Sequence, residues 1–173
     1  AKFNGGLTTL VQATYLGGSG SDQPSTLAVD SDGSVFVAGT TNSSNFPGVA
    51  GGAQPVFGGG FSDAFVAKLN SGLTALAQAT LLGGNGNDNI SALTLNGGQL
   101  FVAGNTGSTN FPGSAGGTQS SIRGSDDAFV ARLSGDLFSL LQATYLGGAV
   151  VDAASAIRVN ASGDVLVAGY TSS

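Results

Sequence analysis

The segment LVQATYLGGSGSD, residues 10–22, is the clearest sign of the architecture of this chain. It returns as LAQATLLGGNGND at residues 76–88 and as LLQATYLGGAVVD at residues 140–152. Gln12, Gln78 and Gln142 hold the same position in the three copies, so the chain repeats with a period of about 65 residues. A fixed period of this length is typical of an array in which each repeat is one supersecondary unit.

Other segments keep the same spacing. VFVAGTTNSSNFPG (35–48) returns as LFVAGNTGSTNFPG (100–113), and DAFVAKL (63–69) returns as DAFVARL (127–133). Short apolar runs bounded by turn residues predict four strands in the first complete repeat, at Ser25–Asp30, Val35–Thr41, Asp63–Asn70 and Leu76–Gly83. No stretch has apolar residues at helical spacing, so we expect almost no helix.

Four antiparallel strands per repeat predict the blades of a β-propeller, and the predicted fold class is therefore all-β. We expect a single region of two complete blades, at 22–84 and 88–148, flanked by two complementary half-blades. Residues 1–18 supply part of the third strand and the whole fourth strand of one blade, and residues 152–173 supply the first and second strands of another. An Ala-Gly pair recurs in each second strand, which predicts close approach of stacked sheets.

Each predicted half-blade leaves a strand edge without a partner, and proteins seldom leave such edges open. Our first expectation is that neighbouring repeats of a longer array supply the missing strands. The second is that other copies of the chain supply them, which gives a closed dimer or a filament. Pairing of the chain's own ends would make a ring of three blades, tighter than the 4–8 blades that propellers usually have.

The composition excludes several classes of function. Charged residues make up only 9% and hydrophobic residues 41%, which is unlike a disordered chain. The net charge is −5, and nucleic-acid binding normally needs a basic surface. Without Cys or His there is no thiol nucleophile, no Ser-His-Asp triad and no zinc site of the usual kind. No apolar run of about 18 residues predicts a membrane span.

One loop suggests calcium. GGNGNDNIS, residues 83–91, fits the nonapeptide of the calcium-binding β-roll. That roll needs nonapeptides in tandem, whereas each match here stands alone and the third copy, GGAVVDAAS, lacks the third glycine. We expect Asp22, Asp88 and Asp152 to accept backbone N–H groups of their Gly-rich loops. Calcium binding at Asp22 and Asp88 is the alternative, and no other cofactor is expected.

The connection between the second and third strands is long, from Thr41 to Ser62 in the first complete repeat. Loops of this length are usually functional or cover part of the fold. Asn45, Phe46, Asn110 and Phe111 are therefore candidate partner-binding residues. The other interpretation, which we expect, is that both phenylalanines pack at blade junctions.

The segments YLGGSGSD, LAVDSDGSVFVAGTT, NFPG and DAFVAKLN together resemble the bacterial β-propeller repeat often called SBBP. The resemblance covers essentially the whole chain, and the third copy departs from it at GGAVVD. It implies a secreted or cell-surface bacterial protein in which such repeats form long arrays. It implies no catalytic residues.

The composition, the repeat and the resemblance differ in how well they fit three classes of function. We expect a non-enzymatic extracellular module for adhesion, scaffolding or fibre assembly, with neighbouring repeats, other copies, or surface glycans and proteins as partners. The alternative is a carbohydrate-binding, lectin-like propeller, for which the aromatic residues are the phenylalanines and Tyr15, Tyr145 and Tyr170. An enzyme would need converging carboxylates, whereas Asp126 and Asp127 are adjacent and would point to opposite faces of a strand.

Overall fold

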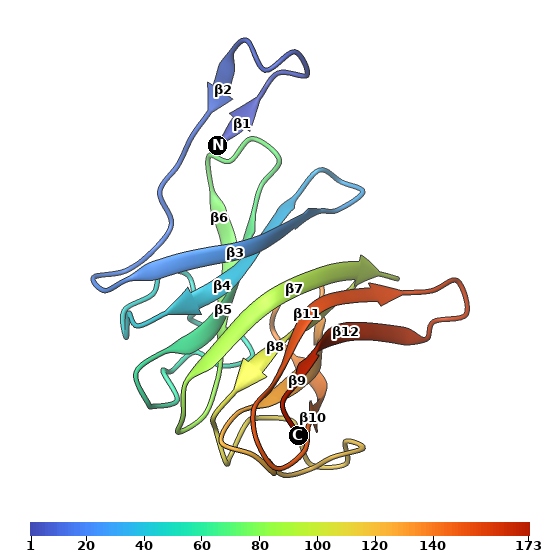
Figure 1. Ribbon diagram of the computed structural model, residues 1–173. Helices are drawn as coiled ribbons and strands as arrows, with labels where there is room; N and C mark the ends of the chain where they lie inside the picture. The colour runs from blue at the N-terminus through green and yellow to red at the C-terminus, as the bar shows by residue number, and fades with distance from the viewer.

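The computed structural model describes residues 1–173 and consists of strands and turns, with no helix that could cross a membrane. Twelve strands follow one another along the chain (Figure 1): β1 (Lys2–Phe3), β2 (Leu10–Gln12), β3 (Asp22–Val29), β4 (Val35–Thr41), β5 (Asp63–Leu69), β6 (Leu76–Leu82), β7 (Asp88–Asn96), β8 (Gln99–Thr106), β9 (Asp127–Ser134), β10 (Leu140–Leu146), β11 (Asp152–Val159) and β12 (Val165–Thr171).

The strands form two four-stranded antiparallel sheets and two two-stranded sheets. Blade 1 is β3-β4-β5-β6 and blade 2 is β7-β8-β9-β10, each in chain order. The two-stranded sheets are β1–β2 at the start of the chain and β11–β12 at its end. The predicted all-β fold of four-stranded propeller blades is confirmed, and the sheets do not close into a ring.

Two strands differ from the prediction by more than one residue at an end. Strand β3 begins at Asp22 rather than at Ser25, because Asp22 already pairs with Thr41 and a bulge follows between Pro24 and Thr26. Strand β2 ends at Gln12, although the matching strand β6 runs through to Leu82. Residues 79–82 of β6 pair with β5, whereas residues 13–16 have no strand beside them.

The recurring Ala-Gly pair has two separate roles. Ala38 and Ala103 are fully buried at the junctions between sheets, as the prediction of close sheet approach requires. The glycines are required because the neighbouring strand of the same sheet leaves no room for a side chain. A Cβ at Gly39 or Gly104 would overlap a backbone carbonyl oxygen of the bulged first strand.

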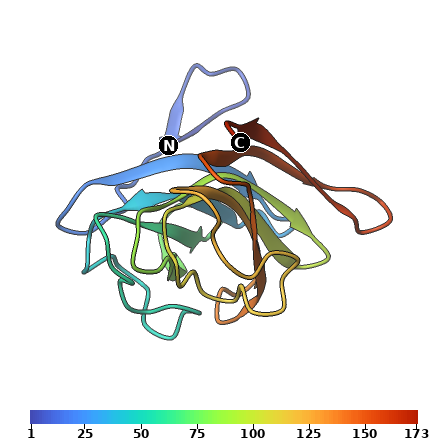
Figure 2. The ribbon, with the colours of Figure 1, turned by 60° about the horizontal axis from the view of Figure 1, so that its bottom comes forward.

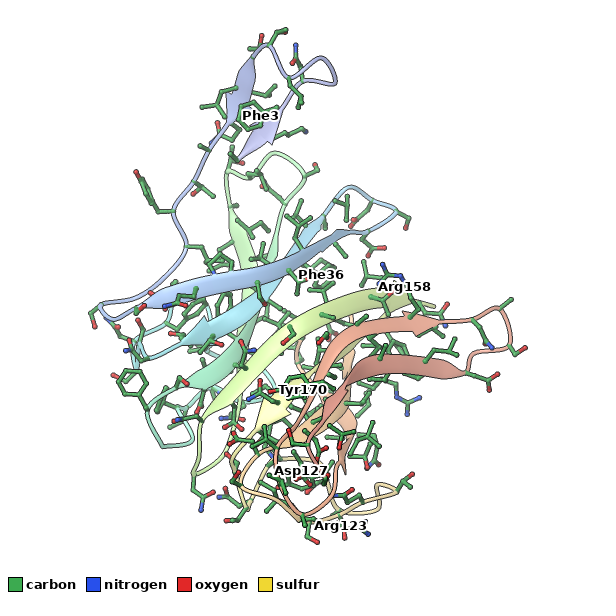
Figure 3. The ribbon with its side chains drawn as sticks, viewed as in Figure 1. Phe3, Phe36, Arg123, Asp127, Arg158 and Tyr170 are labelled. Carbon is green, nitrogen blue, oxygen red and sulfur yellow. The ribbon has the colours of Figure 1, made fainter.

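Successive sheets stack through their first strands, and β3, β7 and β11 lie side by side (Figure 1). Because side chains alternate along a strand, each blade has two apolar faces. We call the face toward the following sheet the forward face and the opposite one the rear face. The forward face of blade 1 meets the rear face of blade 2 in the largest core cluster, and Phe36 lies in this junction (Figure 3). A second cluster joins the forward face of blade 2 to β11–β12.

Candidate functional site

An aspartate at the start of each first strand fastens the Gly-rich loop that precedes it. Oδ2 of Asp22 accepts the N–H of Gly18 at 2.8 Å, and Oδ2 of Asp88 accepts that of Gly84 at 2.9 Å. Oδ2 of Asp152 accepts the matching N–H in the third copy at 2.7 Å. All three carboxylates therefore accept a backbone N–H from their own loop.

In the first two copies, one hydroxyl group at the end of the second strand and one two residues further on complete this arrangement. In the second copy, Thr106 Oγ1 donates to Asp88 Oδ1, and Ser108 Oγ donates to Asp88 Oδ2 at 2.8 Å. Thr41 and Ser43 do the same for Asp22, at 2.5 and 3.1 Å. We call each set of aspartate, hydroxyls and glycine N–H an aspartate staple. Sequence reasoning missed the hydroxyls, although the Thr-x-Ser spacing at residues 41–43, 106–108 and 171–173 could have found them.

The staples bear on the calcium prediction. Burial raises the pKa of Asp88, while the hydrogen bonds from Thr106 and Gly84 lower it. Both oxygens of this carboxylate already accept bonds from protein groups, so a cation would have to displace those donors. Nowhere in residues 1–173 do three or more His, Cys, Asp or Glu side chains come together as a group that could hold a metal ion. Calcium binding at Asp22 or Asp88 stays a prediction.

Each complete blade holds another buried aspartate, at the start of its third strand. In blade 2, Asp127 Oδ2 accepts from Gln119 Nε2 at 2.6 Å and from the N–H of Arg123 at 3.0 Å. Its Oδ1 accepts the N–H of Gly124 at 2.9 Å. In blade 1, Asp63 Oδ2 likewise accepts from Gln54 and Gly58, but its buried Oδ1 has no partner.

Burial raises the pKa of Asp63 from its ordinary value near 3.8 to about 6, and the nearby Asp88 carboxylate contributes to the rise. Gly83 lies between the two carboxyl groups and close to both. A Cβ there would lie 2.6 Å from Asp88 Oδ2 and 2.7 Å from Asp63 Oδ1. Both carboxyl groups are buried, since Asp63 is 0% and Asp88 is 1% exposed.

The candidate partner-binding loops are built into the blades. Phe46 and Phe111 are each 2% exposed. The Phe46 ring lies 4.6 Å from that of Phe65, and the Phe111 ring lies 4.4 Å from that of Phe129. Both rings therefore pack against their own blades and are not presented to a partner.

The asparagines before these phenylalanines are exposed, yet both hold neighbouring loops in place. Asn45 Oδ1 accepts the N–H of Ser19 at 2.9 Å, and Asn110 Oδ1 accepts that of Asn85 at 2.7 Å. The four candidate residues therefore contribute to packing and to loop geometry within the repeat.

The open surfaces lie elsewhere, on the first and last sheets. Leu27 on the rear face of blade 1 is 64% exposed, whereas Leu93 at the same position of blade 2 is 5% exposed. Leu166 on the forward face of β12 is 55% exposed, whereas Phe36 at the same position of blade 1 is fully buried. The chain thus has one uncovered rear face and one uncovered forward face.

A groove of about 810 Å³ runs between the β1–β2 sheet and the rear face of blade 1. We call it the rear groove. Its lining is largely apolar and includes Lys2, Tyr15, Leu27, Val29, Val35 and Leu73.

Comparison with known proteins gives the class that this architecture suggests. Residues 13–47 match the β-propeller repeat family (SBBP), and the matched segment spans the first Gly-rich loop, β3, β4 and the aspartate staple of Asp22. The resemblance seen in the sequence is thereby confirmed for this segment. The same hairpin recurs as β7–β8 and β11–β12, so the matched unit is repeated along the chain. No curated protein matches the chain.

Proposed function

We propose that the chain is a non-enzymatic structural and interaction module whose open blade faces bind further β-propeller repeats. The main support for this proposal is the exposure of Leu27. Its equivalents Leu93 and Ile157 are buried against the preceding sheet, while Leu27 faces solvent. A surface that is buried at every internal junction and open at one end suits another blade of the same kind.

The energetics support association at this face. Burying apolar surface yields roughly 25 cal/mol per Å², and soluble monomers rarely expose large contiguous apolar patches. Val29, beside Leu27 on β3, is also exposed, and both residues line the rear groove. Covering them removes this apolar surface from water without any change in the blade itself.

We further propose that the module serves adhesion, scaffolding or fibre assembly outside a bacterial cell. The support is the resemblance to secreted and surface repeat proteins. A stack of blades that each bind the next suits a scaffold, because the same contact lengthens the array at every step.

The carbohydrate-binding alternative depended on aromatic residues that recur at the surface of each blade. Phe46 and Phe111 are buried, and so is Tyr145, whose hydroxyl donates to the carbonyl of Ser108 at 2.7 Å. The exposed Tyr15 and Tyr170 occupy different positions of the repeat. No repeated aromatic platform supports this alternative.

The proposal is tested by the mass of the chain in solution. We expect sedimentation equilibrium to show association that increases with protein concentration, and Leu27→Asp to weaken that association by tenfold or more, because a charge would be buried at the contact. Val56→Asp is the matched control, since Val56 is similarly exposed but lies outside the rear groove. A wild-type chain that stays monomeric at every concentration contradicts the proposal, and so does an equal effect of the control.

A further inference from the structure

We infer that the β11–β12 hairpin of a second copy fills the rear groove, and that its β12 pairs antiparallel with β1 of the first copy so that Leu166 lies opposite Lys2. This inference rests on the proposed function, because it names the partner and the register for the same open surface.

The β1–β2 sheet already lies where the outer half of a blade belongs. Lys2 Nζ donates to the carbonyl of Ser71 at 3.3 Å, and Lys68 Nζ donates to the carbonyl of Gly135 at 3.2 Å. Lys2 matches Lys68 in the repeat, and Ser71 matches Gly135. At this contact β1 therefore meets blade 1 as β5 meets blade 2. The rear groove is the space that the first two strands of such a blade would occupy.

The β11–β12 hairpin has the surface that this space requires. It projects beyond blade 2, and the edge of β12 away from β11 has no partner strand (Figures 1 and 2). Leu166, Ala168 and Tyr170 share its forward face and are exposed, and Figure 3 shows Tyr170 on β12 and Phe3 on β1. Phe36 and Ala38 hold the positions of Leu166 and Ala168 in blade 1, where blade 2 covers them completely.

The two complete blades give the register. In blade 1, Phe36 pairs with Lys68, and in blade 2, Phe101 pairs with Arg132. The flanking pairs also agree between the blades, since Val35 and Leu100 each face a leucine of the third strand, and Val37 and Val102 each face an alanine. Transferred to the open edges by repeat position, this register pairs Val165 with Phe3, Leu166 with Lys2, and Val167 with Ala1.

A shifted register is unfavourable for a physical reason. Sliding β12 by one residue would turn Leu166 and Tyr170 to the rear face and Val165 and Val167 to the forward face. Lys2 also suits its expected partner. The matching Lys68 amine lies 5.1 Å from the centre of the Phe36 ring, and its aliphatic stem can cover an apolar side chain.

The pairing sets the geometry of assembly. Each copy contributes two complete blades and both halves of a further one. Reciprocal exchange between two copies would close the contact into a dimer. Exchange in one direction only would extend into a filament.

Engineered disulfides test the register, because the chain contains no cysteine. Opposed residues on antiparallel strands have Cα atoms about 4.5–5.5 Å apart, which a disulfide can span. We expect a mixture of the Lys2→Cys and Leu166→Cys chains to form a covalent dimer on mild oxidation, and neither chain alone to do so. The matched control mixes Phe3→Cys with Leu166→Cys and should give less than a tenth of that dimer, since Phe3 belongs to the opposite face.

The outcomes separate this inference from the proposed function. All three substituted residues are exposed, and circular dichroism verifies that each variant is folded. Equal or stronger linkage of the control pair overturns the register. Association of the wild-type chain by mass, with no linkage of either pair, overturns the β12–β1 contact and leaves the proposed function standing. A wild-type chain that remains monomeric overturns both.

Discussion

Asp63 and Asp127 hold the same position in two repeats, yet only Asp127 has hydrogen-bond donors on both carboxylate oxygens. The loop from Gln54 to Asp63 is one residue longer than the loop from Gln119 to Asp127. That extra residue lies in the Gly-rich part of the loop, and Asp63 Oδ1 has no hydrogen-bond partner. A buried carboxylate with an unpaired oxygen disfavours its charged form.

The first prediction concerns the pH dependence of stability. Because the pKa of Asp63 is raised to about 6 in the folded state, its stabilising contribution is present below about pH 4 and is lost as the pH rises through 6. Asp63→Asn removes this ionisation. We expect the variant to exceed the wild type in free energy of unfolding by about 1–2 kcal/mol more at pH 7 than at pH 4. Urea denaturation at both pH values measures the difference.

Asp127→Asn is the matched control for this experiment. Its carboxylate is fully hydrogen-bonded, so the substitution should not stabilise the chain at pH 7. A difference between Asp63→Asn and the wild type that does not change with pH would show that the Asp63 carboxyl has an ordinary pKa.

At the scale of one element, the turn between the third and fourth strands recurs with an unusual backbone. Leu7, Leu73 and Leu137 have φ values of 56°, 55° and 66°, in the left-handed region that favours glycine. Such a conformation costs an L-residue about 1–2 kcal/mol. At Leu137 burial offsets this cost, because its side chain is fully buried in the junction between blades 1 and 2.

This backbone conformation predicts that glycine destabilises the chain less than alanine does at residue 137, the reverse of their usual order. Leu137→Ala and Leu137→Gly both remove the buried side chain, but only glycine is relaxed at this φ. We expect both to destabilise the chain by more than 2 kcal/mol, with glycine about 1 kcal/mol less harmful than alanine. Chemical denaturation measures both values. At the equally buried Leu133 in strand β9, alanine should be the less harmful, and the same order at both positions would refute the backbone explanation.

At the scale of the whole molecule, the stacking of sheets leaves one rear face and one forward face without a neighbouring sheet. Each internal junction covers a forward face with a rear face, so one of each stays open in any chain of stacked blades whose ends do not meet. Association then removes the open surfaces from water and favours the folded state by mass action.

The corresponding prediction concerns thermal stability. The melting temperature of the wild-type chain should rise with protein concentration, because a folded partner binds only the folded state. Leu166→Asp places a charge at the forward face and should make the melting temperature independent of concentration. Differential scanning calorimetry at several concentrations checks both, and an equal rise in the variant would mean that the forward face takes no part in association.

The repeat, the four strands of each blade and the all-β class can all be predicted from the amino-acid sequence. These features follow from the alternation of apolar residues and from turn chemistry, which are local properties of the chain. The sequence also indicated that Asp22, Asp88 and Asp152 would accept loop N–H groups, since this habit of aspartate needs only a few neighbouring residues. The aspartate of each staple can therefore be identified from the sequence.

Which blade faces and loops are covered became known only from the tertiary structure. It buried Phe46 and Phe111, left Oδ1 of Asp63 without a donor, brought the Thr and Ser hydroxyls to the aspartates, and left the rear groove open beside Leu27. The burial of the phenylalanines, the bonds from the hydroxyls and the open groove depend on distances between different strands or sheets, whereas the unpaired oxygen of Asp63 follows from the longer loop before it. Leu27 and Leu93 are equivalent apolar residues of the repeat, and their burial differs because Leu93 has a neighbouring sheet and Leu27 does not.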